Sequence, residues 1–506
     1  MKKIVVFLSL IACFITLRAE KKVEYAASAI MSGASGEFAP LYNSALTHGV
    51  VSSKFTFLGR GGFFSDLNLN DRFSWGIGID LLGGIVSGHD WERYDADTQN
   101  WFAHYEHPAR AWVQQLYGEV KWRGCYATVG LKEHSSALLT QSLTSGDLVE
   151  SGNARPIPEL RIGFVDFQNI PFTNGWVQIQ GEISYGKMTD SDWWDNRLNH
   201  YNGHFVAGEW YNYKRCYFRT KPSTSLSVTL GMQAADVFGG TLYQYERGVL
   251  IKRDKHPVKL KTLFNALLPL RTGAEGFYEG NHLGSWDFKA RYRLPGENGE
   301  VSTYFEWPWE DGSGIGRRNG WDGLWGIEWQ GSLVNNRLTG IVVEYLDFTN
   351  QSGPMHYAPA DFPGETINTE ATGADDYYNN TMYNSYANYG LSIGTPMLMA
   401  PAYNLDGYMA YIGNRLRGFH IAAQGDINSN LSWDIRGGYR KAWGNAKVIL
   451  PHPISSTSVA ASVKWNVKRV PGLEVQSRVA YDHGDMPCKS FGVMATVSYK
   501  GDFLIK

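Results

Sequence analysis

Hydrophobic and polar residues alternate along much of this chain, and the segment Trp286–Leu294 shows the pattern most clearly. Apolar side chains at every second position are separated there by Asp287, Lys289, Arg291 and Arg293. Because successive side chains of a β-strand point to opposite faces, this segment has one apolar and one charged face. A soluble sandwich turns the charged face to water, whereas a membrane barrel turns it to a polar lumen and presents the apolar face to lipid.

The same period of two recurs from one end of the chain to the other. Short alternating segments separated by turn residues are typical of membrane barrels, and counting them gives about 16 to 20 strands, with about 18 as the even number that fits best. Soluble sandwiches over this length would require two or three domains, and no Pro/Ser/Gly linker divides the chain. The other segments that alternate most clearly are 74–80, 177–185, 226–232, 325–330, 341–345, 431–440, 459–468, 473–481 and 491–499.

Three regions interrupt the strand pattern. Residues 133–149 are rich in Ser, Thr and Leu and predict either a helix or a loop folded into a barrel. Residues 258–270 have apolar side chains at helical spacing and predict a helix that plugs one end. Residues 353–395, rich in Pro, Asp, Asn and Tyr, predict a long polar loop of the kind that faces outside.

The N-terminus predicts export. Lys2 and Lys3 precede an apolar run over 4–17, and Leu17-Arg18-Ala19 forms a cleavage site, so residues 1–19 are interpreted as a signal peptide and 20–506 as one barrel domain. The run is shorter than the roughly 20 residues of a spanning helix. A lipoprotein-type box ends at Cys13, but apolar residues follow it, which favours ordinary cleavage.

Composition changes this picture little. Trp, Tyr and Phe make up 14% of the chain, as expected for aromatic girdles and also for a sugar-binding protein. Removing three cations with the signal moves the formal charge from -2 to -5, and no basic run indicates nucleic acid. Cys125, Cys216 and Cys488 are too widely spaced for a disulfide framework or a metal signature.

Sugar binding requires flat aromatic faces together with carboxylates, amides or guanidinium groups that fix hydroxyls. Two segments combine these residue types, and an interfacial aromatic belt is the competing interpretation of each Trp in them. The charged faces also predict ion pairs inside a lumen, which water would weaken. The cations are Lys289, Arg291 and Arg293, and the carboxylates are Glu182, Glu328, Glu344 and Glu474. The candidate carbohydrate-binding residues are Asp192, Trp193, Trp194, Trp307, Trp309, Asp311, Arg317, Arg318 and Trp321.

Catalysis and metal binding have weak support in the sequence. His134 next to Ser135 and Ser136 is the one close Ser–His pairing, and adjacency alone does not make a catalytic dyad. Glu306 and Asp311 are a carboxylate pair of a kind common in any acidic sequence. Asp90, Asp95 and Asp97 lack the terminal Glu of a calcium loop. We therefore expect neither an enzyme nor a cofactor or metal site.

Several blocks, in this order, resemble the Wzi-type capsule-assembly proteins of the outer membrane, in the branch found in Bacteroidetes-like gut anaerobes. The resemblance covers nearly the whole mature chain. It implies an outer-membrane β-barrel of about 18 strands, with a helical plug at the periplasmic end and a lectin role in anchoring surface polysaccharide. The blocks are 151–161 with 170–176, 280–287, 310–314 with 322–326, and 378–380 with 393–396.

Asn153, Arg155, Asn281 and His282 lie in these blocks, either as turn and plug contacts or as secondary sugar contacts. The resulting hypothesis is an all-β transmembrane antiparallel barrel that is not an enzyme and that holds capsular or exopolysaccharide at the cell surface. Its expected partners are that polymer, outer-membrane lipid and the capsule export machinery. The alternative is a porin-like channel for sugars or small solutes, which an open lumen would favour and a plug would oppose.

Overall fold

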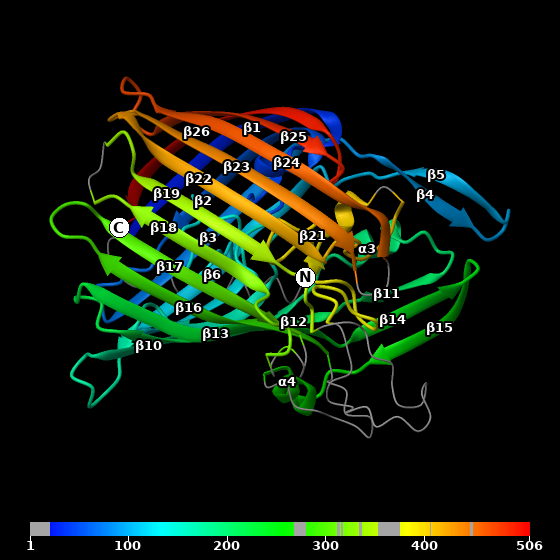
Figure 1. Cartoon of the computed structure of the whole chain (residues 1–506), viewed down its shortest axis with the longest axis horizontal. Helices are drawn as coiled ribbons and strands as arrows, with labels where there is room; N and C mark the ends of the chain where they lie inside the picture. The colour runs from blue at the N-terminus through cyan, green and yellow to red at the C-terminus, as the bar shows by residue number, and fades with distance from the viewer. Residues whose placement is uncertain are drawn as a thin grey trace.

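The computed structural model describes residues 21–267, 280–310, 314, 317–332, 336–352, 375–404, 406–445 and 449–505. Eighteen antiparallel strands form one closed ring, as the alternating pattern predicts (Figure 1). The ring strands are β1 (Lys21–Phe38), β2 (Ser53–Ser65), β3 (Phe73–Val86), β6 (Ala111–Trp122), β7 (Cys125–Leu131), β8 (Glu159–Phe164), β10 (Val177–Lys187), β12 (Trp210–Thr220), β13 (Leu226–Phe238), β16 (Asn281–Arg293), β17 (Glu300–Trp309), β18 (Gly323–Gln330), β19 (Gly340–Asp347), β22 (Leu416–Asn428), β23 (Leu431–Gly444), β24 (Ile449–Asn466), β25 (Leu473–Gly484) and β26 (Ser490–Ile505).

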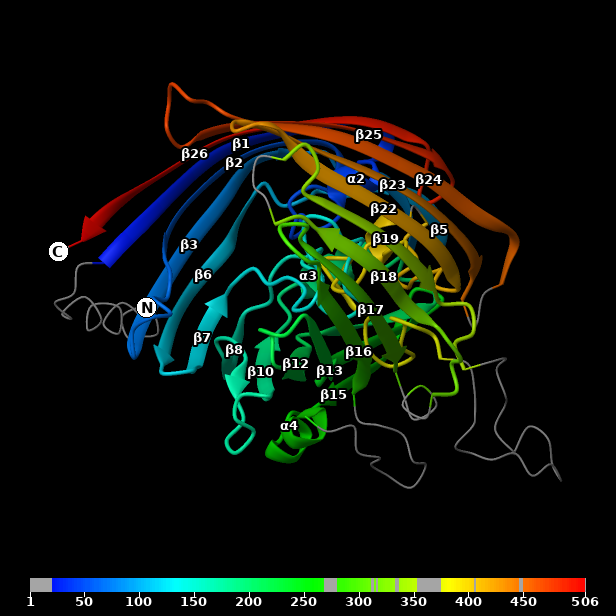
Figure 2. The same ribbon diagram turned by 60° about the vertical axis from the view of Figure 1, so that its left-hand side comes forward.

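The ring closes between its first and last strands. β1 and β26 pair antiparallel from Lys21 with Ile505 to Ala34 with Gly492, side by side as Figure 2 shows. Every other ring strand pairs with its neighbours in chain order, so the ring has no free sheet edge. Closure satisfies the backbone N–H and C=O groups along the whole wall, which is the requirement for strands in contact with lipid.

The two faces of the wall differ as the sequence predicts. On β16, Trp286, Phe288 and Tyr292 point outward and are exposed, whereas Asp287 is buried on the lumen side. Comparable outward apolar residues lie on other strands around the ring, including Ile77, Ile79 and Leu81 on β3, Phe419 and Ile421 on β22, and Phe491, Val493 and Val497 on β26. The barrel therefore has an apolar outer band and a polar interior, which is the pattern of a barrel that spans a membrane.

The two ends of the barrel carry different connections. At the end where β1 begins and β26 ends, the turns are short, such as the two residues between β6 and β7. This is called the short-turn end. The opposite long-connection end carries a hairpin, a three-stranded sheet and the helix α3, which lie toward the right of Figure 1. The elements outside the ring are α2 (Leu41–Ser44), β4 (Asp90–Asp95), β5 (Asn100–Tyr105), β9 (Gln168–Asn169), α3 (Ser191–Arg197), β11 (Gly203–Ala207), β14 (Gly240–Glu246), β15 (Val249–His256), α4 (Leu260–Leu267), β20 (Ala387–Asn388), β21 (Leu391–Ser392) and a 3-10 turn, Pro401–Tyr403.

Within the described ranges, no helix combines the length and apolar character needed to cross a bilayer. The predicted signal peptide, residues 1–19, lies outside the described residues.

Candidate functional site

A segment between β7 and β8, residues 132–158, folds into the lumen and is called the plug segment. Most of its residues from Leu143 onward are buried, including Leu143, Val149 and Ser151, which have essentially no exposed surface. Of the two forms that the sequence predicts for 133–149, the inward loop is the one observed, because the segment has turns and bends but no helix. Its polar backbone is satisfied by lumen side chains instead of by helical hydrogen bonds.

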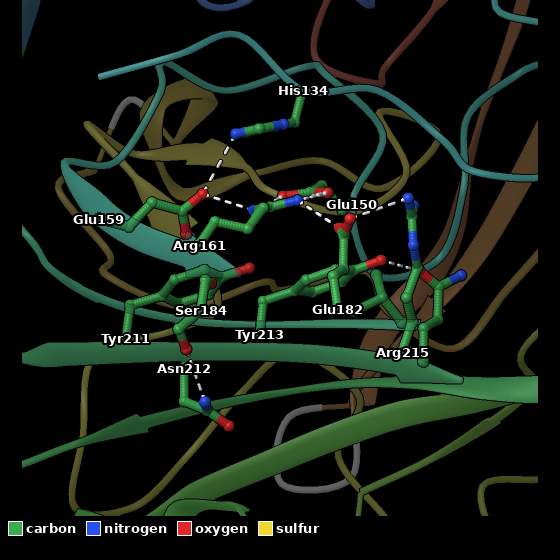
Figure 3. Close-up of polar contacts among 12 residues, drawn as sticks. His134, Glu150, Glu159, Arg161, Glu182, Ser184, Tyr211, Asn212, Tyr213 and Arg215 are labelled. Carbon is green, nitrogen blue, oxygen red and sulfur yellow. Dashed lines mark hydrogen bonds and ion pairs between the residues drawn. The ribbon is translucent and has the colours of Figure 1, made fainter. Parts of the chain in front are cut away.

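A buried charge cluster fixes the plug segment to the near wall (Figure 3). The guanidinium group of Arg161 on β8 lies 2.7 Å from Glu159, 2.7 Å from Glu182 on β10 and 2.6 Å from Glu150 of the plug segment. The Arg161 side chain is only 2% exposed. Since an unpaired buried charge is costly, the three carboxylates and this guanidinium depend on one another. This set is called the Arg161 cluster.

Two more basic side chains complete the Arg161 cluster. Arg215 on β12 lies 3.1 Å from Glu182, and the imidazole of His134 lies 3.2 Å from Glu159. His134 belongs to the first half of the plug segment and Glu150 to its second half, and both approach the same wall (Figure 3). The cluster is therefore a latch between plug and barrel. The imidazole of His134 contacts Glu159, and the hydroxyl of Ser136 donates to Asp147 at 2.6 Å. His134 and Ser136 therefore do not form a nucleophile–base pair.

The plug segment also bonds to the wall across the ring from β7 and β8. Thr144 and the backbone N–H of Ser145 donate to Glu344 on β19 at 2.6 and 2.7 Å, and the N–H of Leu148 donates to Glu306 on β17 at 2.9 Å. Because these strands lie opposite the strands from which the segment departs, the chain crosses the full width of the lumen.

Lumen charges do pair with one another, as Arg215 does with Glu182, but Lys289 and Glu344 do not form the ion pair that the strand pattern predicts. The ammonium group of Lys289 donates to the backbone carbonyl of Leu138 at 2.6 Å, and Glu344 accepts from plug groups. Arg291 does find a carboxylate, Glu300, at 3.3 Å. The reason is that the plug supplies unpaired backbone and hydroxyl groups in the lumen, and ionised side chains make strong hydrogen bonds to them.

Two further connections join the plug. The phenol of Tyr42 on α2 lies 2.7 Å from His420 on β22, and Arg440 on β23 donates to the backbone carbonyl of Met397 at 3.1 Å. Residues 375–395 belong to the region predicted as an outward polar loop, but they are mostly buried in the barrel mouth. Residues 353–374 lie outside the described residues.

The prediction that a helix from 258–270 plugs the barrel is wrong. Residues 258–270 were predicted to plug one end, yet α4 packs on β12 and β13 from outside the barrel (Figures 1 and 2). In the described ranges the helical content of the plug is limited to the single turn α2 and the 3-10 turn Pro401–Tyr403. Apolar periodicity predicted the helix correctly but not its position, because spacing does not say which surface an apolar stripe will face.

A pocket of about 280 Å³ lies at the long-connection end, between the chain around α3 and β11 and residues 376–410. Its lining contains Trp194, Tyr383, Tyr408 and His204 as ring-bearing residues, with Asp376 as the carboxylate. Among the described residues, the lining includes no Lys or Arg. We call it the amide pocket after six side chains that it contains: Asn199, Asn202, Asn379, Asn380, Asn384 and Asn445.

Two of these amides hold the pocket walls together. Asn384 accepts from the N–H of Val206 and donates to its carbonyl, both at 2.9 Å, which ties the loop to β11. Its amide also donates to Glu209 at 2.9 Å, and burial raises the pKa of Glu209 well above its usual range. Asn379 makes the same two-way contact with the backbone of Tyr411, at 2.8 and 2.9 Å.

Other lining residues have groups that the described protein does not bind. Asn199 and Asn202 accept backbone N–H groups through their carbonyl oxygens, at 3.0 and 2.9 Å. In the described part of the chain their amide nitrogens have no protein partner. Tyr408 is 38% exposed, so part of its ring is open at the pocket. Amides both donate and accept, which suits hydroxyl groups, and an open ring suits an apolar sugar face.

The predicted residues of α3 support this pocket more than they line it. Trp194 is 1% exposed and donates its indole N–H to Asp190 at 2.8 Å, so it is a core residue that also forms one pocket wall. Trp193 is half-buried and meets Trp194 edge to face at 5.0 Å. Asp192 is exposed on the same helix.

The second predicted group lies elsewhere. Trp307 on β17 points outward and stacks on Trp321 at 5.7 Å, next to Phe305 and Trp325. Trp309 is buried. Arg317 and Arg318 are exposed, and the guanidinium group of Arg317 lies 5.6 Å from the ring centre of Trp307. Asp311 lies outside the described residues. Stacked outward rings near a strand end are the arrangement of an aromatic belt.

The four secondary candidates make structural contacts. Asn153 donates to the carbonyl of Ser392 at 3.0 Å and accepts the N–H of Leu46 at 3.1 Å. The guanidinium group of Arg155 lies over Trp112 at 4.1 Å and also contacts Tyr389. Asn281 accepts from Asn380 at 3.1 Å. His282 lies 3.6 Å from Asp236 on the outer face of the wall.

Most of the amide pocket was missed by sequence reasoning. The available signal was the density of Asn and Tyr over 376–388, which predicted a polar loop but not a site. The pocket forms only where this segment meets residues 194–204, almost two hundred positions earlier.

The chain therefore belongs to the class of closed transmembrane β-barrels. It has eighteen antiparallel strands, a plug in the lumen and a pocket among its long connections. No protein-family model matches the sequence, and no curated protein matches it either. Among solved structures, the chain is similar to Wzi of Escherichia coli, described as an outer-membrane protein involved in group 1 capsule assembly and a carbohydrate-binding β-barrel.

The similarity to Wzi has a TM-score of 0.58 at 16% identity and covers 98% of this chain and 87% of that chain. Pseudomonas aeruginosa OprD aligns with 96% of this chain and 96% of its own, at TM-score 0.45 and 8% identity. Acinetobacter baumannii OccAB4 aligns with 96% of this chain and 99% of its own, at TM-score 0.45 and 9% identity. At these identities the comparison with Wzi shows a shared fold.

Proposed function

We propose that this protein is an outer-membrane lectin of the Wzi type, in its Bacteroidetes-like branch, that holds surface polysaccharide in the amide pocket. The apolar outer band supports placement in the outer membrane, and long connections of such barrels face the outside of the cell. The plug segments then enter from the extracellular end, whereas the resemblance implied a periplasmic plug. The observation that carries the proposal is an amide- and ring-lined pocket at this outer end.

The pocket favours an uncharged polymer. Its lining combines six amides with one carboxylate and one imidazole, and no Lys or Arg is among the described residues there. Acidic sugars are normally recognised by Arg and Lys, whose guanidinium and ammonium groups pair with carboxylates. Retention of the polymer should therefore be nearly unchanged by salt, because screening weakens charge pairs and leaves neutral hydrogen bonds and stacking largely intact. Release of polymer at high ionic strength would contradict the neutral class.

A single pocket of this size binds weakly, and a polymer compensates by repetition. Many copies of the protein on one cell engage many repeat units, so avidity exceeds the affinity of each site. The capsule export machinery fits as the partner that delivers polymer to the surface.

The test compares variants in a strain that lacks the chromosomal gene. Deletion should shed polymer into the medium with unchanged total synthesis. Wild-type protein should restore retention, whereas Tyr408→Ala combined with Asn199→Ala should not, because the exposed ring and one lining amide are removed. Trp321→Ala is the matched control, since this exposed aromatic lies outside the pocket. Full retention with the pocket variant would refute the site.

The alternative of a porin-like channel is opposed by the plug segment, which bonds to both sides of the lumen. Under the lectin proposal, purified wild-type protein in a planar bilayer should show no steady conductance. A steady open channel would favour the alternative.

A further inference from the structure

The helix α4 lies on the outside of the barrel at the extracellular ends of β12 and β13, where Figures 1 and 2 both place it beyond the wall. It belongs to the connection between β15 and β16. Its position is unusual for a loop helix, because it covers a part of the wall that elsewhere is bare and apolar.

The wall beneath α4 is polar. Paired residues of an antiparallel sheet share a face, and Cys216, Met232 and Trp286 form an outward row. Toward the long-connection end, four residues from Cys216 and Met232, the same outward face carries Asn212 paired with Asp236. Lys214, on the same face, is buried although it points away from the lumen. These strand ends thus interrupt the apolar band of the barrel with charged and amide groups.

The helix covers this polar patch with its own polar side. The ammonium group of Lys214 donates to the carbonyl of Ala266 at 2.6 Å, and the phenol of Tyr185 on β10 donates to the carbonyl of Leu263 at 2.7 Å. Thr262 and Asn265 are buried against the wall. A cation at the C-terminal carbonyls also complements the helix dipole.

The apolar side of α4 consequently faces away from the protein. Leu260 is 87% exposed and Phe264 55% exposed, and Leu263 and Leu267 are half-buried on the same side. These positions follow the i, i+3, i+4, i+7 spacing of one helix face. A helix on a water-soluble surface is oriented the other way, with its apolar stripe on the core and its polar face outward.

We propose that α4 is a lipid-facing helix whose apolar stripe contacts the acyl chains of the outer leaflet, and that it restores the apolar band over the polar wall patch. The apolar outward face next to the stripe, with Leu230 exposed on β13 and Trp286 and Phe288 exposed on the neighbouring strand β16, identifies the occupant as lipid. This inference rests on the membrane placement in the proposed function, and it assigns to α4 the role of a membrane anchor instead of a plug.

The test places one nitroxide label at a time on protein reconstituted in phosphatidylethanolamine/phosphatidylglycerol vesicles. Cys125, Cys216 and Cys488 are first replaced by Ser. Phe264→Cys reports the helix, Leu230→Cys reports the bare wall, and Phe172→Cys, fully exposed in a short-end turn, reports water. The measured quantity is the ratio of collision rates with oxygen, which concentrates in hydrocarbon, and with a water-soluble nickel chelate.

The label at 264 should favour oxygen to nearly the same degree as the label at 230, and the label at 172 should favour nickel. An aqueous ratio at 264 with a hydrocarbon ratio at 230 overturns the inference and leaves the proposed function standing. Aqueous ratios at both positions overturn the membrane placement and the inference together. Lys214→Met gives a second readout. Loss of the contact between Lys214 and Ala266 should increase the mobility of the 264 label, and unchanged mobility would contradict the role of Lys214 in holding α4 on the wall.

Discussion

Arg161→Met should unlatch the plug segment. The guanidinium group lies within 3 Å of Glu150, Glu159 and Glu182 at once, and no other cation of the described residues does so. Its removal leaves three buried carboxylates with the Arg215 guanidinium and the His134 imidazole as the remaining basic groups of the cluster. Breaking a buried ion pair from one side costs about 3–5 kcal/mol, which corresponds to roughly a 10²- to 10⁴-fold change in an equilibrium constant.

The released state is where that energy is recovered. Glu159 and Glu182 belong to the wall, but Glu150 belongs to the plug segment, so withdrawal of the segment takes one carboxylate into water and admits water to the others. The closed state of the plug therefore bears most of this free-energy penalty. The ring is held by continuous strand pairing and is not destabilised. The expected result is a folded barrel with a mobile plug.

Two measurements check this prediction. Planar-bilayer recordings should change from silent in the wild type to intermittent conductance in Arg161→Met, and hydrogen exchange over residues 143–151 should accelerate by at least tenfold. Arg219→Met is the matched control, because Arg219 bonds to Gln178 on the wall without contacting the plug. A variant as silent and as protected as the control would refute the latch.

Three further predictions follow from the loops. Burial raises the pKa of Asp190 to about 6, so the stability contributed by protonated Asp190 is fully present below the ordinary pKa of 3.8 and is lost as pH rises through 6. Limited proteolysis of the α3 region should be slower at pH 5 than at pH 7.5, and Asp190→Asn should remove this difference. Gly390→Ala should destabilise the β20–β21 turn by about 1–3 kcal/mol, because Gly390 has φ +71° and a Cβ would lie 2.2 Å from the Trp193 ring. Hydrogen exchange over 387–392 measures this effect, with Gly61→Ala, where a Cβ has open space, as the control; equal protection in both variants would contradict the packing. Thr144→Val should lower the thermal stability of the plug by about 1–3 kcal/mol, because Glu344 loses a buried donor at 2.6 Å; a melting temperature equal to that of the wild type would count against this contact.

The aromatic residues show how far a residue type alone can be interpreted. Trp193, Trp194, Trp307 and Trp321 satisfy the same chemical requirement in the sequence, and both a belt and a sugar site were open for each. The structure places Trp307 and Trp321 on the outer wall and Trp194 in the core beside the pocket. The ring type predicts an apolar contact, but the position in the fold decides whether the partner is lipid, protein or sugar.

The sequence by itself determined the wall. Alternation is a local property of an extended chain, so the outward position of Trp286 and the inward position of Asp287 follow from neighbouring residues, and the number of such segments predicts the size of the ring. The tertiary structure alone decided what fills the lumen, where α4 lies and where the amide pocket forms. Each of these depends on contacts between distant segments, such as Arg161 with Glu150 across the lumen edge or Lys214 with Ala266 outside it. A polar group must be paired when it is buried, but its local sequence does not specify the partner, because the partner is set by the path of the connecting chain.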